Sequence, residues 1–129
     1  MIEVLIPRNP RFRLFERQCR KLYEENQAKI HDPNTFDFIC NNTFFYMFVF
    51  DNRLIGAIYY FIDEEGKLFL NGFANRKMHS LNLECLRMSL DWFKCDIYAE
   101  VQNKASALCL RKCGFEKVGE RVYRFSRMD

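Results

Sequence analysis

The chain has 129 residues, of which 49% are hydrophobic and 16% aromatic, and its formal net charge is +3. This length suits a single domain, predicted over residues 1–129, and the apolar content can form a core, which excludes an intrinsically disordered protein. A net charge this small does not by itself indicate a nucleic-acid partner, and we expect none.

The first part of the sequence predicts one strand followed by one helix. Apolar residues alternate over residues 2–6, which predicts a short strand that stops at Pro7. A helix is expected between Pro10 and Pro33, because proline is tolerated at helix starts and opposes continuation. Its apolar face consists of Phe12, Phe15, Cys19, Leu22 and Tyr23.

The same segment carries most of the basic residues near the N-terminus. They are Arg8, Arg11, Arg13, Arg17, Arg20 and Lys21. We interpret them as a solvated helix face whose long side chains also cover apolar surface. A nucleic-acid-binding surface is the alternative, and the lack of interleaved aromatic residues argues against it.

The middle of the chain predicts three antiparallel strands. Aromatic and β-branched runs cover Phe44–Phe50, Leu54–Ile62 and Lys67–Phe73. The Asp51-Asn52 pair and the segment 63–66 supply the two short turns between them. The runs are almost continuously apolar, which indicates a sheet covered on both faces.

The last part of the chain alternates helices and strands. A second helix is predicted over Leu83–Phe93, followed by a strand over Asp96–Val101. Because a helix connects them, this strand is expected to run parallel to Lys67–Phe73. A short helix over Ala105–Lys112 then leads to a terminal hairpin, formed by Phe115–Val118 and Val122–Phe125 around Gly119. Gly114 is expected to end the short helix in the left-handed conformation.

The element order is therefore β-α-β-β-β-α-β-α-β-β. It predicts an α/β (α+β) fold with a mixed, mainly antiparallel sheet of six to seven strands and helices on both faces.

Six cysteines could form disulfides, but their context argues for free thiols. The start of the chain lacks a basic segment and a long apolar run, so no signal peptide is predicted. No CxxC pair or paired histidines are present, so no metal site is expected. We therefore predict a cytoplasmic protein with reduced cysteines and no membrane span.

Near the C-terminus, one stretch resembles a motif of the GNAT (N-acetyltransferase) superfamily. In that family an Asn after the fifth strand is followed by Ala or Ser three residues later, then by Lys and Gly-Phe. Asn103, Ser106, Lys112 and Gly114-Phe115 occupy those positions, and the strand order extends the resemblance to nearly the whole chain. The resemblance implies the GNAT fold, acetyl-CoA or CoA as the cofactor, and an amine as the acyl acceptor.

The family's pyrophosphate loop, Q/R-x-x-G-x-G/A, corresponds to residues 76–81. Arg76 matches the Arg/Gln position, whereas His79 and Leu81 stand where the family has small residues. Their side chains narrow the approach to a phosphate, which predicts weak, altered or absent cofactor binding. The cofactor-binding residues that the resemblance implies are Phe73, Arg76, Lys77, His79, Ser80 and Asn103.

Two of these residues also have simpler interpretations. His79 could contact a phosphate, or it could pack over the first turn of the following helix, which we prefer. Ser80 could be the N-cap of that helix.

The resemblance provides few candidates for catalysis. The family's usual acid, a Tyr in the late helix, corresponds to Leu110, so Ser106 is the substitute candidate or an ordinary helix residue. No carboxylate lies on the Lys67–Phe73 strand. Glu100 is the nearest acid/base candidate, and an exposed strand-end charge is its alternative role.

Two functions follow from these features. The first is an acyl-CoA-dependent N-acyltransferase that acts on an amine of a small molecule or protein. The second is a non-catalytic binding or assembly protein with a protein partner, since Leu90–Phe93 is also similar to GNAT-like proteins carried by phages, some of them labelled head-assembly proteins. A gap between the two parallel strands that is plugged by Phe69, Phe73 or Met78 would favour the second function.

Overall fold

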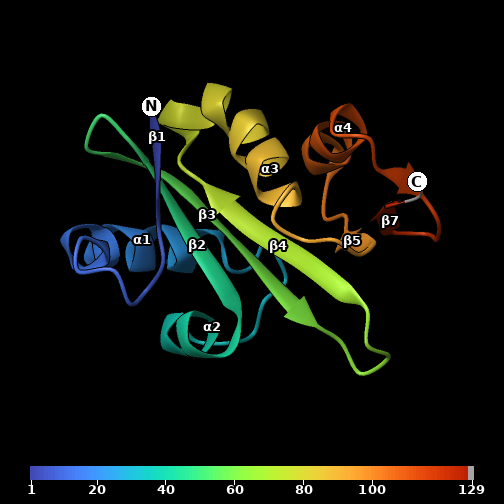
Figure 1. The fold of residues 1–129 in the computed structure, drawn as a ribbon, viewed down its shortest axis with the longest axis horizontal. Coiled ribbons are helices and arrows are strands. Elements are labelled where there is room, and N and C mark those ends of the chain that lie inside the picture. The colour runs from blue at the N-terminus through green and yellow to red at the C-terminus, as the bar shows by residue number, and fades with distance from the viewer. Residues whose placement is uncertain (128–129) are drawn as a thin grey trace.

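Within residues 1–127, seven strands form one mixed sheet, shown in Figure 1. The computed structural model describes residues 1–127. The strands are β1 (Ile2–Leu5), β2 (Phe44–Phe50), β3 (Arg53–Ile62), β4 (Leu68–Ala74), β5 (Ile97–Glu100), β6 (Glu116–Lys117) and β7 (Val122–Phe125). Their order is β1-β2-β3-β4-β5-β7-β6, and every neighbouring pair is antiparallel except β4 and β5. The predicted parallel step and the mainly antiparallel sheet are therefore confirmed.

Helices cover both faces of this sheet, as its apolar strands predict. They are α1 (Phe12–Asn26), α2 (Phe36–Asn42), the 3₁₀ helix η1 (Arg76–Leu81), α3 (Asn82–Leu90) and α4 (Lys104–Lys112). Figure 1 shows α1 and α2 on one side of the sheet and α3 and α4 on the other. Among residues 1–127, no helix has both the length and the apolar composition that crossing a bilayer requires.

Two neighbouring tyrosines of β3 show how the sheet separates its two cores. Tyr59 faces α1 and α2 and is 1% exposed, in a cluster with the rings of Phe45 and Phe73. Tyr60 faces α3 and is 0% exposed, in a cluster that includes Leu86 of that helix. Successive side chains of a strand point to opposite faces, so a continuous apolar strand can serve both layers.

The helix α2 was not predicted, and its sequence explains why. It has seven residues, too few to show a helical period, and it combines aromatic residues with asparagines. The side-chain oxygen of Thr35 accepts a hydrogen bond from the backbone N–H of Phe38 at 3.1 Å, which caps its first turn. Phe36 and Ile39 are buried against the sheet, so tertiary packing stabilises this short helix.

Several boundaries differ from the predicted ones by a few residues. The second helix was predicted to reach Phe93 but ends at Leu90, because the N–H groups of Asp91 and Trp92 turn back to the carbonyls of Met88 and Ser89. The predicted strand over residues 115–118 contains only the two residues of β6.

The end of α4 follows the prediction closely. Gly114 has a φ of +96°, the left-handed conformation that favours glycine. Its N–H donates to the carbonyl of Arg111, and the N–H of Phe115 donates to the carbonyl of Leu110, both near 3 Å. These two bonds make a Schellman motif, which ends the helix and directs the chain into the final hairpin.

Candidate functional site

The parallel strands β4 and β5 separate after only three paired positions. The paired residues are Leu68, Phe69 and Leu70 of β4 with Ile97, Tyr98 and Ala99 of β5. Beyond them β4 continues to Ala74 paired with β3 on its other edge and with no partner on the β5 side. In Figure 1 the β4 arrow runs up and away from β5. A cleft of about 700 Å³ opens at this point and is lined by residues of β3, β4, β5, α3 and α4, and by the end of α1.

The edge of β4 beyond Leu70 presents backbone groups to this cleft that have no partner on β5, although the N–H of Gly72 donates to the side-chain oxygen of Asn71 at 2.8 Å. The N–H of Asn75 donates to the carbonyl of Ile55 on β3 at 2.7 Å. Backbone direction alternates along a strand, so Phe73 also turns toward β3, whereas Gly72 and Ala74 turn toward the cleft. Neither Gly72 nor Ala74 has a partner on β5 in the described register. An extended chain with amide groups could pair here as an added strand.

Gly72 is needed at this edge because the backbone of β3 approaches it closely. A Cβ at this position would lie 2.9 Å from the carbonyl oxygen of Ala57 and 3.4 Å from a side-chain carbon of Ile58. The lack of a side chain also keeps the centre of the cleft open, since Gly72 is among the lining residues.

Of the three large side chains that could have plugged the gap, Phe69 and Met78 do not line the cleft, and Phe73 lines it but packs into the core. Phe73 is 6% exposed and packs against Tyr23, with ring centroids 5.4 Å apart, in the core beneath α1. Phe69 stacks between Phe61 and Tyr98. Met78 packs in a separate small cluster beneath α3. The gap between the strands is therefore open.

The loop that was compared with a pyrophosphate site is wound into η1. Asn75 caps it, accepting the N–H of Lys77 at its side-chain oxygen and that of Met78 at its carbonyl, at 3.1 and 2.9 Å. The N–H of Asn82 donates to the carbonyl of His79. These three backbone donors are thus used within the segment, and a phosphate would have to compete for them.

The predicted residues of this loop divide into two groups. His79 and Ser80 are exposed and line the cleft, while Arg76 and Lys77 are exposed but do not line it. The prediction that Ser80 caps the following helix is wrong. The residue before α3 is Leu81, which makes no side-chain cap bond, because η1 already provides the helical turn that precedes α3.

Asn103 and Ser106 meet at the other wall of the cleft as a capping box for α4. The Asn103 side-chain oxygen accepts the N–H of Ser106 at 2.9 Å, and the Ser106 hydroxyl oxygen accepts the N–H of Asn103 at 3.3 Å. The same hydroxyl lies 3.0 Å from the Asn103 carbonyl, to which it donates. Both residues line the cleft, and this pairing gives each a structural role.

The other catalytic candidates are placed very differently. Glu100 is exposed at the end of β5 and lines both the cleft and an adjacent hollow of about 260 Å³. Leu110, at the position of the family's tyrosine, is 5% exposed and belongs to the core beneath α3 and α4. All three residues line the cleft, but Leu110 has no polar group, so of the three Glu100 and Ser106 are the ones that could exchange a proton with a ligand.

Sequence reasoning did not identify the polar side chains on the α1 side of the cleft. Asn71 is the one polar residue in an otherwise apolar strand, and it lines the cleft from β4. Its side-chain NH₂ donates to the Tyr59 hydroxyl at 3.1 Å, and Tyr59 in turn donates to Asp32 at 2.5 Å. A polar residue within an apolar strand was the available signal, but its partners lie 12 and 41 residues away in the sequence.

All six cysteines are free, and two of them line the cleft. Burial raises the pKa of Cys85 to about 12, and burial also raises the pKa of Cys109. Neither is a thiolate near neutral pH, so neither has the usual property of a nucleophilic cysteine. Within residues 1–127, no three His, Cys, Asp or Glu side chains are grouped as metal ligands would be.

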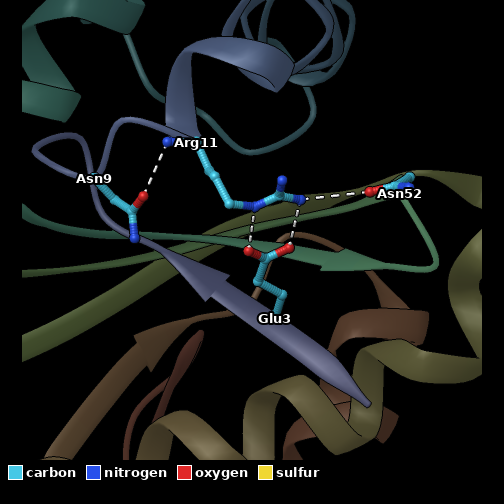
Figure 2. A network of polar contacts seen from close by, with 4 residues as sticks. All are labelled: Glu3, Asn9, Arg11 and Asn52. Carbon is cyan, nitrogen blue, oxygen red and sulfur yellow. Dashed lines mark hydrogen bonds and ion pairs between the residues drawn. The ribbon is translucent and has the colours of Figure 1, made fainter.

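The basic segment near the N-terminus is partly neutralised by acidic partners. Arg11 donates two hydrogen bonds to the carboxylate of Glu3, at 2.6 and 3.0 Å, and reaches Asn52 at 3.4 Å (Figure 2). Arg20 pairs with Asp37 of α2 at 2.8 Å. Two of the six basic side chains therefore connect structural elements, which agrees with a solvated helix face.

Comparison with known proteins identifies the fold. No protein-family model matches the sequence, and no curated protein matches it significantly. Among solved structures, an N-acetyltransferase from Staphylococcus aureus Mu50 is 16% identical with a TM-score of 0.77, covering 100% of this chain and 99% of that one. The aminoglycoside acetyltransferase AAC(6')-Ib in complex with coenzyme A is 11% identical with a TM-score of 0.65, covering 98% and 95%. The chain therefore has the fold of GNAT acetyltransferases.

Two further similar structures carry acceptor names. AAC(6')-Ib in complex with coenzyme A and kanamycin is 12% identical with a TM-score of 0.63, covering 98% of this chain and 95% of that one. A chimera of the spermidine N-acetyltransferase SpeG from Vibrio cholerae and hSSAT is 16% identical with a TM-score of 0.60, covering 95% and 93%.

Proposed function

We propose that this protein transfers an acyl group from acyl-CoA to an amine. The observation that carries the proposal is the open edge of β4, where the carbonyl of Gly72 and the backbone groups of Ala74 face a cleft of about 700 Å³ without a partner on β5. The pantetheine arm of CoA is an extended chain with two amides, so it suits such an edge. The GNAT fold and the coenzyme A complex of AAC(6')-Ib support this choice of ligand.

The residues around the cleft can then be given roles. The strand edge at Gly72 and Ala74 aligns the pantetheine arm and brings the thioester to the point where β5 diverges. Glu100 is the group that accepts a proton from the attacking amine, directly or through a water molecule. Ser106 gives a proton to the CoA thiolate as the carbon–sulfur bond breaks and regains one from solvent, while Glu100 releases to solvent the proton that it took, so that amide and thiol are formed and both residues are restored.

An amine is the acceptor that the comparisons favour. Kanamycin and spermidine, which appear in the names of two similar structures, both carry primary amines. On the α1 side the lining of the cleft includes Ile30 and three polar or charged residues, Asn26, Lys29 and Asn71. A polar molecule is therefore a better candidate for the acceptor than an apolar one.

Calorimetry with acetyl-CoA is the direct test of this proposal. We expect saturable binding in the micromolar to millimolar range, and acetylated product by mass spectrometry when a primary amine is added. Ser106→Ala should lower kcat by a larger factor than it raises the Kd for acetyl-CoA, because an acid acts mainly in the transition state. Ser126→Ala, an exposed serine that does not line the cleft, is the matched control.

A non-catalytic binding or assembly protein is the second candidate, and the loop at η1 favours it. The backbone donors of Lys77, Met78 and Asn82 are used within the segment, and His79 projects where the family has a small residue. For this candidate, including the phage assembly role that the sequence resemblance implies, acetyl-CoA should not bind at millimolar concentration. That result would overturn the acyltransferase proposal.

A further inference from the structure

Asp32 is a buried carboxylate whose oxygens are all used by neighbouring donors. It is 9% exposed. One oxygen accepts the backbone N–H and the side-chain NH₂ of Asn34, each at 2.9 Å. The other accepts the Tyr59 hydroxyl at 2.5 Å. A buried charge needs such partners, so Asp32 holds the phenol proton of Tyr59 in a fixed direction.

Tyr59 passes this orientation on to Asn71. Burial first, and the hydrogen bond to Asp32 second, raise the pKa of Tyr59 well above its ordinary value, so the phenol stays protonated. Its single proton points at Asp32, which leaves its oxygen able only to accept. The side-chain NH₂ of Asn71 supplies that donor at 3.1 Å and also donates to the carbonyl of Ile30 at 3.2 Å.

These partners determine which way the Asn71 amide points. Two acceptors, the Tyr59 oxygen and the Ile30 carbonyl, face one end of the amide, and the N–H of Gly72 faces the other at 2.8 Å. The reverse orientation would put a carbonyl against two acceptors and an NH₂ group against a donor. The Asn71 side-chain oxygen therefore lies at the edge of β4, on the wall of the cleft.

We propose that Asp32, Tyr59 and Asn71 form a positioning chain that presents the Asn71 side-chain oxygen to the acceptor amine. An amide oxygen has two lone pairs, and the N–H of Gly72 uses one of them. The second accepts an N–H of the amine and orients its nitrogen toward a thioester held along the same strand edge. Asn71 is the binding residue, while Tyr59 and Asp32 act through it.

A neutral oxygen suits this task on a strand that has no carboxylate. Glu100 already supplies one carboxylate to the cleft, and a second one beside the amine would further favour the ammonium form, which has no lone pair with which to attack. An amide oxygen can orient the neutral amine without that electrostatic preference. This inference rests on the proposed acyltransferase function and names the residue of the cleft that receives the acceptor.

The test uses the full-length protein with acetyl-CoA and a panel of primary amines, for example n-butylamine, benzylamine and a lysine-containing tripeptide. Asn71→Ala should raise the KM for the amine about three- to tenfold, the effect of losing one neutral hydrogen bond, and leave the KM for acetyl-CoA within about twofold. Tyr59→Phe should raise the amine KM by a smaller factor, because Asn71 remains but loses its fixed orientation.

Two matched variants separate positioning from general damage to the fold. Asn42→Ala removes another asparagine that donates to a backbone carbonyl, at the end of α2 and away from the cleft. Tyr60→Phe removes the other buried β3 phenol, which is hydrogen-bonded to Ser89 at 2.7 Å on the opposite face. Neither should change the amine KM. Circular dichroism confirms that each variant is folded.

A second readout does not depend on turnover. In the CoA-saturated protein labelled with ¹⁵N, adding n-butylamine should shift the backbone amide resonance of Gly72 in the wild type and not in Asn71→Ala. Unchanged amine KM in Asn71→Ala, with acetylation intact, would overturn this inference alone. If the wild type neither binds CoA nor acetylates any amine of the panel, the proposed function fails and this inference fails with it.

Discussion

The two ends of the cleft differ in how they are prepared for a ligand. At the β4 edge, a buried carboxylate, a phenol and an amide fix one oxygen beside the open strand. At η1, backbone donors are paired with Asn75 and His79 inside the segment itself. Under the proposed function, polar groups at the end assigned to bond formation are oriented in advance, whereas those at the end assigned to the diphosphate are already satisfied. Affinity for acyl-CoA should therefore come mainly from the pantetheine arm.

Blocking the open edge of β4 with a side chain should have the largest effect on acetyl-CoA binding. Gly72→Val places a side chain in the cleft and a Cβ 2.9 Å from the carbonyl of Ala57, so β3 and β4 must shift. We expect acetyl-CoA binding to become undetectable by calorimetry, and the free energy of unfolding to fall by about 1–3 kcal/mol.

Gly66→Ala is the control for this substitution. Gly66 lies in the β3–β4 turn at a φ of +83°, and a Cβ at this position would meet no atom within 4 Å outside its two chain neighbours. The variant should lose about 1 kcal/mol of stability through its left-handed backbone and retain acetyl-CoA binding. Equal binding by both glycine variants would show that the β4 edge is not the ligand site.

The next effect concerns stability and compares the two buried tyrosines of β3. Tyr59→Phe leaves an oxygen of the buried Asp32 without its donor, so the free energy of unfolding should fall by about 2–3 kcal/mol. Tyr60→Phe leaves only the neutral hydroxyl of Ser89, which still donates to the carbonyl of Leu86, and should cost about 1 kcal/mol. Urea denaturation measures both. A larger loss for Tyr60→Phe would contradict the assignment of Asp32 as the charged end of the network.

The smallest effect on acetyl-CoA binding is expected from changes in η1, the segment assigned to the diphosphate. If η1 contributes little, acetyl-CoA and acetyl-pantetheine, which lacks the diphosphate and the nucleotide, should bind with Kd values within about threefold of each other. Replacing both His79 and Leu81 by glycine should strengthen acetyl-CoA binding by about tenfold through one restored charge-assisted contact, and leave acetyl-pantetheine unchanged. The opposite result is a wild type that binds acetyl-CoA about a hundredfold more tightly than acetyl-pantetheine. That result would contradict the expectation that η1 contributes little to affinity.

Much of the fold follows from local patterns in the sequence. The period of apolar residues predicts the strands, and the helical connection predicts the parallel step between β4 and β5. Gly114 marks the end of α4 because no other residue type adopts its φ as easily. The helix α2 was missed because seven residues, stabilised by burial of Phe36 and Ile39, carry no periodic signal.

The candidate site was only partly predictable. Asn103 and Ser106 were found through a family motif, and their spacing is also that of a capping box, which the structure shows them to form. Asn71 was visible as a polar residue in an apolar strand, but its importance depends on Tyr59 and Ile30. Contacts of this kind join distant parts of the chain, so they appear only once the tertiary structure is known.

Three residue pairs join β4 to β5, so the sheet consists of two parts that are connected by one short pairing. One part contains β1 to β4, and the other contains β5, β7 and β6. Opening is easier where fewer backbone bonds must break, and the β4–β5 pairing is shorter than every other except the edge pair β6–β7, so the two parts of the sheet should separate there first. A ligand bound between the two parts would add hydrogen bonds to both of them and couple their fluctuations. Amide hydrogen exchange in β5 should then slow when the cleft is filled, even where no atom of the ligand touches the strand.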